Sequence, residues 1–228
     1  MQLWIRNLSS YGGQIDDLFW LITALVGFWF VLAQVILFYF VFRYRRRPGR
    51  PALHVRGDKW GQLSWIIVPL ILVVACDFWI DVATANVWEN IKEHIPAADA
   101  RIRVDAQQWA WTFTHPGPDG KLDTPDDIVT VDDLHIEVGK TYVYELRSKD
   151  VLHSFCIPVF RLKQDAIPGR SISGWFKATE AGKFDIQCTE ICGIGHAFMP
   201  AHLTIESAED HKKWMTPAAP VQQKQTFE

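Results

Sequence analysis

The densest set of metal-binding side chains lies in one short stretch near the C-terminus. From Cys188 to Met199 the sequence reads Cys-Thr-Glu-Ile-Cys-Gly-Ile-Gly-His-Ala-Phe-Met, which holds two thiols, an imidazole and a thioether. Thiolate and thioether sulfur are soft ligands that suit copper, whereas imidazole suits several transition metals. Because there are two cysteines here, two thiolates can bridge a pair of copper ions. The stretch therefore favours a copper centre that uses Cys188, Cys192, His196 and Met199.

A second imidazole must come from another part of the chain. His153, which precedes Cys188 by 35 residues, is the best candidate because it begins a predicted strand. Two other interpretations remain open at this point. Cys188 and Cys192 can form a disulfide or a redox-active thiol pair in an oxidising compartment, and two cysteines with one histidine can bind zinc. Methionine is a poor zinc ligand, so Met199 favours copper.

The residues around these candidate ligands predict a β-domain. Short stretches rich in Val, Ile, Tyr, Trp and Thr alternate with turn residues. The predicted strands cover residues 101–105, 109–114, 134–137, 141–147, 171–178, 183–187 and 201–205. So many short strands within about 130 residues predict an all-β antiparallel sandwich or barrel over residues 90–215. The Pro- and Gln-bearing tail, residues 216–228, is predicted to be disordered.

The first 89 residues predict a two-helix transmembrane hairpin. Residues 18–42 carry no formal charge, and about 20 apolar residues suffice to cross a bilayer. A second span is predicted over residues 61–88, where Trp residues lie near both ends as they do at membrane interfaces. The connecting loop, residues 43–59, has seven basic residues against a single aspartate, a net charge of +6. The excess of positive charge predicts that this loop is cytoplasmic and that residues 90–215 lie outside.

Composition excludes several classes of protein. Hydrophobic residues make up 49% of the 228 residues, which rules out a chain that is disordered throughout. The formal net charge of −3 is unlike that of a nucleic-acid-binding protein, which is usually basic. The charge is divided unevenly, because residues 81–228 hold 15 basic and 22 acidic residues, or −7. An acidic outer domain follows a basic inner loop.

Several longer motifs resemble one family over nearly the whole chain. They read Asp-Val-Leu-His-Ser at 150–154, Lys-Gln-Asp-Ala-Ile-Pro-Gly-Arg at 163–170, Gln-Cys-Thr-Glu-Ile-Cys-Gly at 187–193, His-Ala-Phe-Met-Pro at 196–200 and Trp-Ala-Trp at 109–111. Together they resemble subunit II of haem–copper cytochrome c oxidases. That family places two N-terminal helices before an outer cupredoxin-like domain. The resemblance implies this fold.

The resemblance also implies a role for each site residue. Cys188 and Cys192 would bridge the two ions of a dinuclear copper centre called CuA. His153 and His196 would each bind one copper, with Met199 as a weak ligand. The backbone carbonyl of Glu190 would complete the set, while its side chain would face a Mg²⁺ (or Mn²⁺) site shared with subunit I. Electrons would enter at Trp109.

The implied function is that of the electron-accepting subunit of a respiratory oxidase. It would take single electrons from reduced cytochrome c, or a similar one-electron donor, and pass them to the haem of subunit I, where oxygen is reduced to water. Subunit III and membrane lipid are further expected partners, and acidic groups such as Asp150 are expected to attract a basic donor. The expected location is a bacterial inner membrane, with CuA on the periplasmic side. The alternative is a membrane-tethered copper chaperone or thiol–disulfide protein.

The remaining histidines of the outer domain are predicted to bind no metal. His94, His115 and His211 are expected to be solvated. His135 and His202 are expected to pack against neighbouring side chains.

Overall fold

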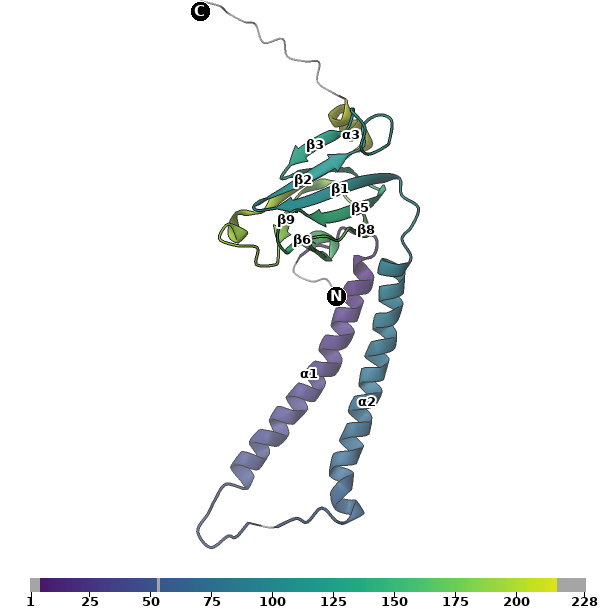
Figure 1. The fold of residues 1–228 in the computed structure, drawn as a ribbon. Coiled ribbons are helices and arrows are strands. Elements are labelled where there is room, and N and C mark those ends of the chain that lie inside the picture. Colours follow the sequence, from purple (N-terminus) through teal and green to yellow (C-terminus); the bar gives the residue numbers. More distant parts are fainter. Residues whose placement is uncertain (1–4, 53, 217–228) are drawn as a thin grey trace, which may run out of the picture. The chain divides into compact units, whose positions relative to one another are not determined.

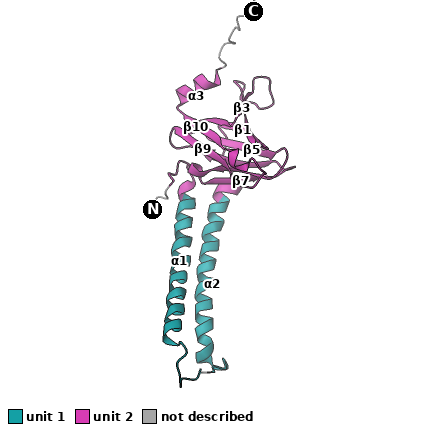
Figure 2. Cartoon of the chain, turned by 90° about the vertical axis from the view of Figure 1, so that its left-hand side faces the viewer, with its two compact units in different colours: residues 1, 14–89 teal, residues 2–13, 90–228 magenta. Residues whose placement is uncertain are grey.

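The computed structural model describes residues 5–52 and 54–216, which belong to two compact units. One unit contains residues 14–89, and the other contains residues 2–13 together with 90–228 (Figure 2). Of the tail predicted to be disordered, all but Thr216 lies outside the described residues.

Two long apolar helices make up most of the first unit, α1 (Gly12–Arg43) and α2 (Trp60–Trp88). The predicted spans lie inside them, and both helices are long and apolar enough to cross a membrane. No residue of α2 is buried within the described chain. Because the exposed side chains are apolar, both helices need a lipid or protein environment around them.

The outer domain is a sandwich of two five-stranded sheets (Figure 1). The first has the order β3-β2-β1-β5-β8 and consists of β1 (Ala100–Gln107), β2 (Ala110–His115), β3 (Ile128–Val131), β5 (Thr141–Ser148) and β8 (Ile172–Lys177). The second has the order β4-β10-β9-β6-β7 and consists of β4 (Asp133–Glu137), β6 (His153–Ile157), β7 (Leu162–Ala166), β9 (Gly182–Cys188) and β10 (Ala201–Glu206). Short helical segments lie at Glu89–Glu93 (η1), Pro158–Phe160 (η2), His196–Phe198 (η3) and Ala208–Met215 (α3).

Aromatic side chains between the two sheets form the core. Phe155 of the second sheet is fully buried, and its ring centroid lies 5.4 Å from that of Trp111 and 5.9 Å from that of Tyr144, both on the first sheet. Residues alternate between buried and less buried along β1 and β4, as expected for sheets with one face in the core. These contacts hold the two sheets face to face.

The predicted cupredoxin-like β-sandwich is confirmed. Each of the seven listed strands is present, and so is the strand that His153 was predicted to begin. The sheets are mixed instead of purely antiparallel, because β1 pairs with β5 and β4 pairs with β10 in parallel. Strands β3 and β7 were not predicted. β7 has the sequence Leu-Lys-Gln-Asp-Ala, whose polar centre gives little β signal, and its pairing with β6 determines its conformation.

The segment before α1 packs on the outer domain. The Leu8 amide donates to the Val159 carbonyl at 2.8 Å, and the Thr179 amide donates to the Leu8 carbonyl at 2.9 Å. Leu8 and Tyr11 are 2% and 3% exposed. The sequence analysis placed these residues in the membrane hairpin. Their packing on the outer domain could not be predicted, because it depends on backbone pairing with residues far away in the sequence.

Helix α3 buries two of the histidines. Trp214 stacks on His135 with ring centroids 4.5 Å apart and meets His115 edge-on at 4.9 Å. His115 is 2% exposed and His211 is 8% exposed, so the prediction that they are solvated is wrong. The short, charged sequence of α3 gave no sign that its Trp214 and His211 pack on the sandwich.

The other three histidines divide as follows. His135 packs as predicted, with Nδ1 2.8 Å from Glu206 Oε1 and Nε2 3.0 Å from Asp133 Oδ2. His94 is exposed, also as predicted. The packing prediction for His202 is wrong, because its side chain is 75% exposed on β10.

We expect His115 to make the outer domain less stable in acid. Burial, followed by His211 and His135 nearby, lowers the pKa of His115 from 6.5 to about 3. Below pH 6.5 the unfolded state therefore binds a proton that the folded state does not, and the free energy of unfolding falls by at most about 1.4 kcal/mol per pH unit for this group. Thermal unfolding of the full chain in detergent from pH 7 to pH 4 measures the effect.

The variant His115→Phe is expected to flatten this pH dependence. His202→Phe is the matched control, because the exposed His202 side chain has no buried environment to lose. An unchanged slope in His115→Phe would show that other groups cause the acid sensitivity.

Candidate metal centre

The predicted copper ligands meet where two inner strands of the second sheet end. Cys188 is the last residue of β9, and His153 is the first residue of β6. These strands are neighbours, with Phe155 opposite Cys188 in the antiparallel register. Since side chains two residues apart share a face of a strand, His153 and Phe155 point the same way. The pairing therefore brings the His153 imidazole to the Cys188 thiol.

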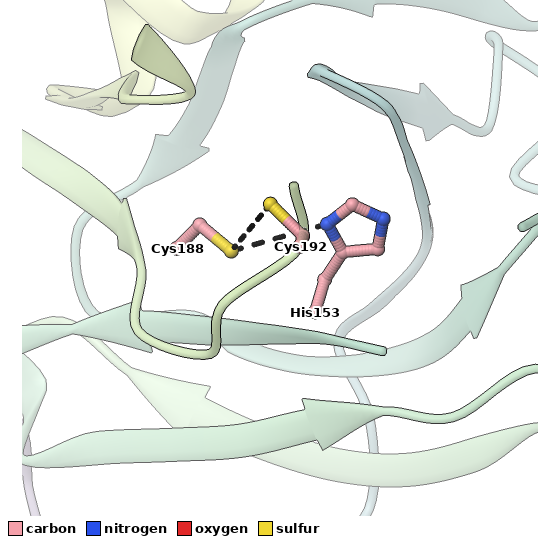
Figure 3. A group of neighbouring side chains, drawn as sticks. All are labelled: His153, Cys188 and Cys192. Carbon is pink, nitrogen blue, oxygen red and sulfur yellow. Dashed lines mark hydrogen bonds between the residues drawn. The ribbon is translucent and has the colours of Figure 1, made fainter. Parts of the chain in front are cut away.

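Two sulfurs and one imidazole nitrogen form the centre of the cluster (Figure 3). The Sγ atoms of Cys188 and Cys192 are 3.8 Å apart. The Nδ1 atom of His153 lies 3.9 Å from Cys188 Sγ. The three ligand atoms all lie within 4.8 Å of one another, close enough to share metal ions.

The loop between β9 and β10 supplies the remaining donors. His196 Nδ1 is 3.5 Å from Cys192 Sγ, and Met199 Sδ is 3.9 Å from the same sulfur. The backbone carbonyl of Glu190 is 3.4 Å from Cys188 Sγ. The structure thus brings together all six donors that the sequence named, on the two strand ends and the loop that follows β9.

A carboxylate holds His153 with its Nδ1 atom toward the sulfurs. Asp150 Oδ1 lies 2.9 Å from His153 Nε2 and also accepts the Val151 amide at 2.6 Å, while Oδ2 accepts the Gln108 amide at 2.6 Å. Burial alone would raise the pKa of Asp150, but these hydrogen bonds outweigh it and hold the pKa below its ordinary value. Carboxylates commonly orient metal-binding histidines in this way.

The cluster is largely shielded from water. His153 is fully buried, Met199 is 1% exposed and Cys192 is 3% exposed. Burial, followed by the adjacent Cys188 thiol, raises the pKa of Cys192 to about 11. The metal-free thiol is therefore protonated at neutral pH, and metal binding has to release its proton.

The donor set fits copper better than the other two interpretations. A disulfide has its sulfurs about 2.05 Å apart, whereas here both cysteines are free and their sulfurs are 3.8 Å apart. A structural zinc ion takes four ligands and seldom takes thioether sulfur. One zinc ion needs fewer donors than the two thiols, two imidazoles, thioether and carbonyl found here. The three sulfur donors are soft ligands, which suit copper. The residues present therefore fit a dinuclear copper centre.

Trp109 lies beside the loop that carries Cys192. Its indole Nε1 donates to the Cys192 carbonyl at 3.3 Å, and the ring remains 38% exposed. The neighbouring Gln108 side chain donates to the same carbonyl at 2.8 Å. Trp109 therefore contacts solvent on one side and the backbone of a candidate ligand on the other.

The Glu190 side chain points away from the sulfurs toward a lysine. Lys163 Nζ donates to Glu190 Oε1 at 2.9 Å and to Asp165 Oδ1 at 3.3 Å. This pairing raises the pKa of Lys163, with Glu190 as the largest cause. Glu190 thus contributes its backbone oxygen to the cluster and its carboxylate to the surface.

Sequence reasoning missed the roles of Asp150 and Gln108. Asp150 was expected to attract the electron donor, yet its carboxylate is occupied by His153 and two backbone amides. Its spacing of three residues from His153 was a usable signal. Gln108 gave none, because its partner Cys192 is 84 residues away in the sequence.

Comparisons with known proteins identify the family of the chain. The family model described as cytochrome c oxidase subunit II, periplasmic domain, matches residues 101–207. The alternative cytochrome c oxidase subunit 2 of Bradyrhizobium diazoefficiens is 32% identical over 93% of this chain and 83% of its own length. The cytochrome c oxidase subunit 2 of Cereibacter sphaeroides is 28% identical over 93% of this chain and 78% of its own length.

One solved structure is similar over the outer domain. The periplasmic domain of subunit II of cytochrome oxidase from Bradyrhizobium japonicum is 32% identical, with a TM-score of 0.47, and the match covers 54% of this chain and 94% of that one. The sequence matches extend through both helices and the sandwich. This chain therefore belongs to the cytochrome c oxidase subunit II family, whose members are subunits of a respiratory oxidoreductase that associate with subunit I.

Proposed function

We propose that this chain accepts single electrons from reduced cytochrome c, or a similar donor, at a dinuclear CuA centre and passes them to the haem of subunit I. Oxygen is reduced to water there. The observation that carries the proposal is the convergence of six donors around Cys188 and Cys192. Absorption and EPR spectra of the copper-loaded full chain test it.

The residues around the centre would keep its geometry fixed and exclude water from it. The copper would be held by Cys188, Cys192, His153, His196, Met199 and the Glu190 carbonyl. Bound copper supplies one-electron redox chemistry. Asp150 fixes the His153 ring, and the buried Met199 and Cys192 exclude water. A rigid, buried site keeps its geometry when the charge changes, which favours fast transfer.

Trp109 is the proposed point at which electrons enter. Its exposed edge can contact the haem edge of a docked cytochrome, and its Nε1 atom reaches the backbone of Cys192. A donor with a basic face fits the charge of −7 over residues 81–228.

We expect the reaction with cytochrome c to slow as ionic strength rises. Opposite charges on the two proteins speed their encounter by about 10-fold or more, and salt screens them over about 8 Å at physiological strength. Stopped-flow reduction of the copper-loaded chain at increasing salt measures this. A rate that does not change with salt would indicate an apolar docking surface or a donor that is not basic.

A separate set of exposed apolar residues suits the contact with subunit I. Ile191, Ile194 and Phe198 of the metal loop are 82%, 93% and 84% exposed. Exposed apolar residues that form one patch commonly mark a protein interface, and these three lie within eight positions of one loop. We assign this surface to subunit I, with Glu190 beside it. The Mg²⁺ (or Mn²⁺) site at the Glu190 carboxylate remains a prediction from the resemblance, which metal analysis of a Glu190→Ala oxidase would test. Contact with subunit III also remains a prediction.

The proposed location is a bacterial inner membrane, with the sandwich in the periplasm and residues 43–59 in the cytoplasm. The charge of +6 on that loop and the two apolar helices support it. In this arrangement, the two helices α1 and α2 anchor the chain and residues 90–215 carry CuA. Labelling of a cysteine introduced at position 50 from the outer side of oriented vesicles would contradict the orientation.

A membrane-tethered copper chaperone or thiol–disulfide protein is the less favoured alternative. A thiol exchanger needs an accessible thiolate, whereas Cys192 is 3% exposed and has a raised pKa. The buried second imidazole also exceeds what transient copper transfer needs.

A further inference from the structure

We propose that Gly195 and Gly193 of the metal loop are positioning residues that let the Trp109 indole ring pack directly against the loop. We call the surface formed by these two glycines the seat. The position of the ring on this seat would set the rate at which electrons enter. This inference rests on the proposed function, in which electrons enter at Trp109. One electron leaves the donor haem and one arrives at the copper centre, with no bond formed or broken and no proton moved.

Gly195 is in direct contact with the face of the indole ring. A Cβ atom at Gly195 would lie 2.3 Å from Trp109 Cδ2, 2.6 Å from Cγ and 2.8 Å from Cε2. These ring atoms belong to a rigid group that cannot bend out of the way. Ordinary van der Waals contact between carbons begins near 3.5 Å. Trp109 can therefore occupy this position only if residue 195 has no side chain.

Gly193 forms the other side of the seat. A Cβ atom there would lie 2.9 Å from Gln108 Nε2 and 3.3 Å from Trp109 Cζ2. The φ angle of Gly193 is +119°, a conformation that favours glycine. Gly193 thus allows the loop to turn while Gln108 and Trp109 lie against it.

One hydrogen bond holds the Trp109 ring against the loop, and a second holds the neighbouring Gln108 side chain there. Both the Trp109 indole and the Gln108 amide donate to the Cys192 carbonyl, at 3.3 and 2.8 Å. The Gln108 backbone amide is also held by Asp150, which contacts His153. The ring is therefore fixed relative to two candidate ligands, and the two glycines make the close approach possible.

The variant Gly195→Ala is expected to push the ring away from the Cys192 carbonyl. A displacement of 1 Å at a reacting group can cost about 100-fold in rate, so we expect electron uptake from reduced cytochrome c to slow by about 10-fold or more. The copper-free full chain in detergent, labelled with 5-fluorotryptophan, provides a readout independent of electron transfer. Its Trp109 resonance, identified by its loss in Trp109→Phe, is expected to shift.

Two control variants separate a steric effect from general disturbance of the loop. Ile194→Ala changes the adjacent, 93% exposed side chain and is expected to leave the Trp109 resonance unchanged. Gly13→Ala adds the same methyl group where no atom lies within 4 Å. If Gly195→Ala leaves the Trp109 resonance in place, no seat exists and the proposal is overturned.

A double-mutant cycle tests whether Gly195 acts through Trp109. In a Trp109→Ala background the added methyl has no ring to displace, so Gly195→Ala is expected to cause no further loss of rate. If Gly195→Ala alone changes the copper spectrum, adding Trp109→Ala is expected to reverse that change. An equal loss of rate in both backgrounds would overturn the positioning role. If Trp109→Ala itself leaves the rate unchanged, electrons do not enter at Trp109, and that part of the proposed function is wrong whatever the resonance shows.

Discussion

Cys192→Ser is expected to abolish the dinuclear copper spectrum of the full chain. Its sulfur lies 3.8 Å from Cys188 Sγ, 3.5 Å from His196 Nδ1 and 3.9 Å from Met199 Sδ, so it is next to three of the other donors. A serine hydroxyl is a hard ligand that stays protonated at neutral pH and cannot bridge two soft ions. Copper content and absorption spectra of the loaded variant measure the loss. Cys188→Ser is expected to have the same effect.

One histidine outside the cluster and one inside it provide the controls for this experiment. His202→Ala removes an imidazole that is 75% exposed, and it is expected to leave copper content and spectrum unchanged. His153→Ala removes the buried ligand and is expected to lose or severely distort the site. The bridging assignment is wrong if either serine variant keeps two coppers and the same spectrum.

Trp109→Ala is expected to slow electron uptake from reduced cytochrome c by about 10-fold or more, because it removes the ring that lies between solvent and Cys192. Trp109 is outside the donor set, so the copper spectrum is expected to stay the same. Stopped-flow reduction at several donor concentrations separates the transfer step from docking. We expect the limiting rate to fall far more than the apparent affinity.

Another exposed aromatic residue of the outer domain provides the control. Phe198→Ala removes an 84% exposed ring from the surface assigned to subunit I, so it is expected to leave reduction of the isolated chain unchanged. A wild-type limiting rate in Trp109→Ala would show that electrons enter elsewhere on the outer domain.

The sequence carried most of the information about the fold, since period-two alternation and long apolar runs depend on local chemistry. Both helices and eight strands were predicted in this way. The missed elements depend on distant partners. β7 follows from its pairing with β6, and the parallel pairs of β1 with β5 and β4 with β10 join strands far apart in the chain. Local propensity contains no record of such pairings.

The ligand set was also predictable, because Cys188, Cys192, His196 and Met199 are close in sequence. The surroundings of the ligands were not. The contacts from Asp150 to Gln108 and from Gln108 to Cys192 span 42 and 84 residues. The seat at Gly195 depends on the way in which two loops approach each other, and a glycine in a sequence does not reveal what it leaves room for.

The central claim is that the cluster around Cys188 and Cys192 holds a pair of copper ions. The most direct test is to combine copper analysis with EPR on the copper-loaded full chain. The prediction is two coppers per chain and the hyperfine pattern of an electron shared equally by two copper nuclei. One copper per chain with the pattern of a single nucleus, or a chain that binds no copper when its thiols are reduced, would contradict it.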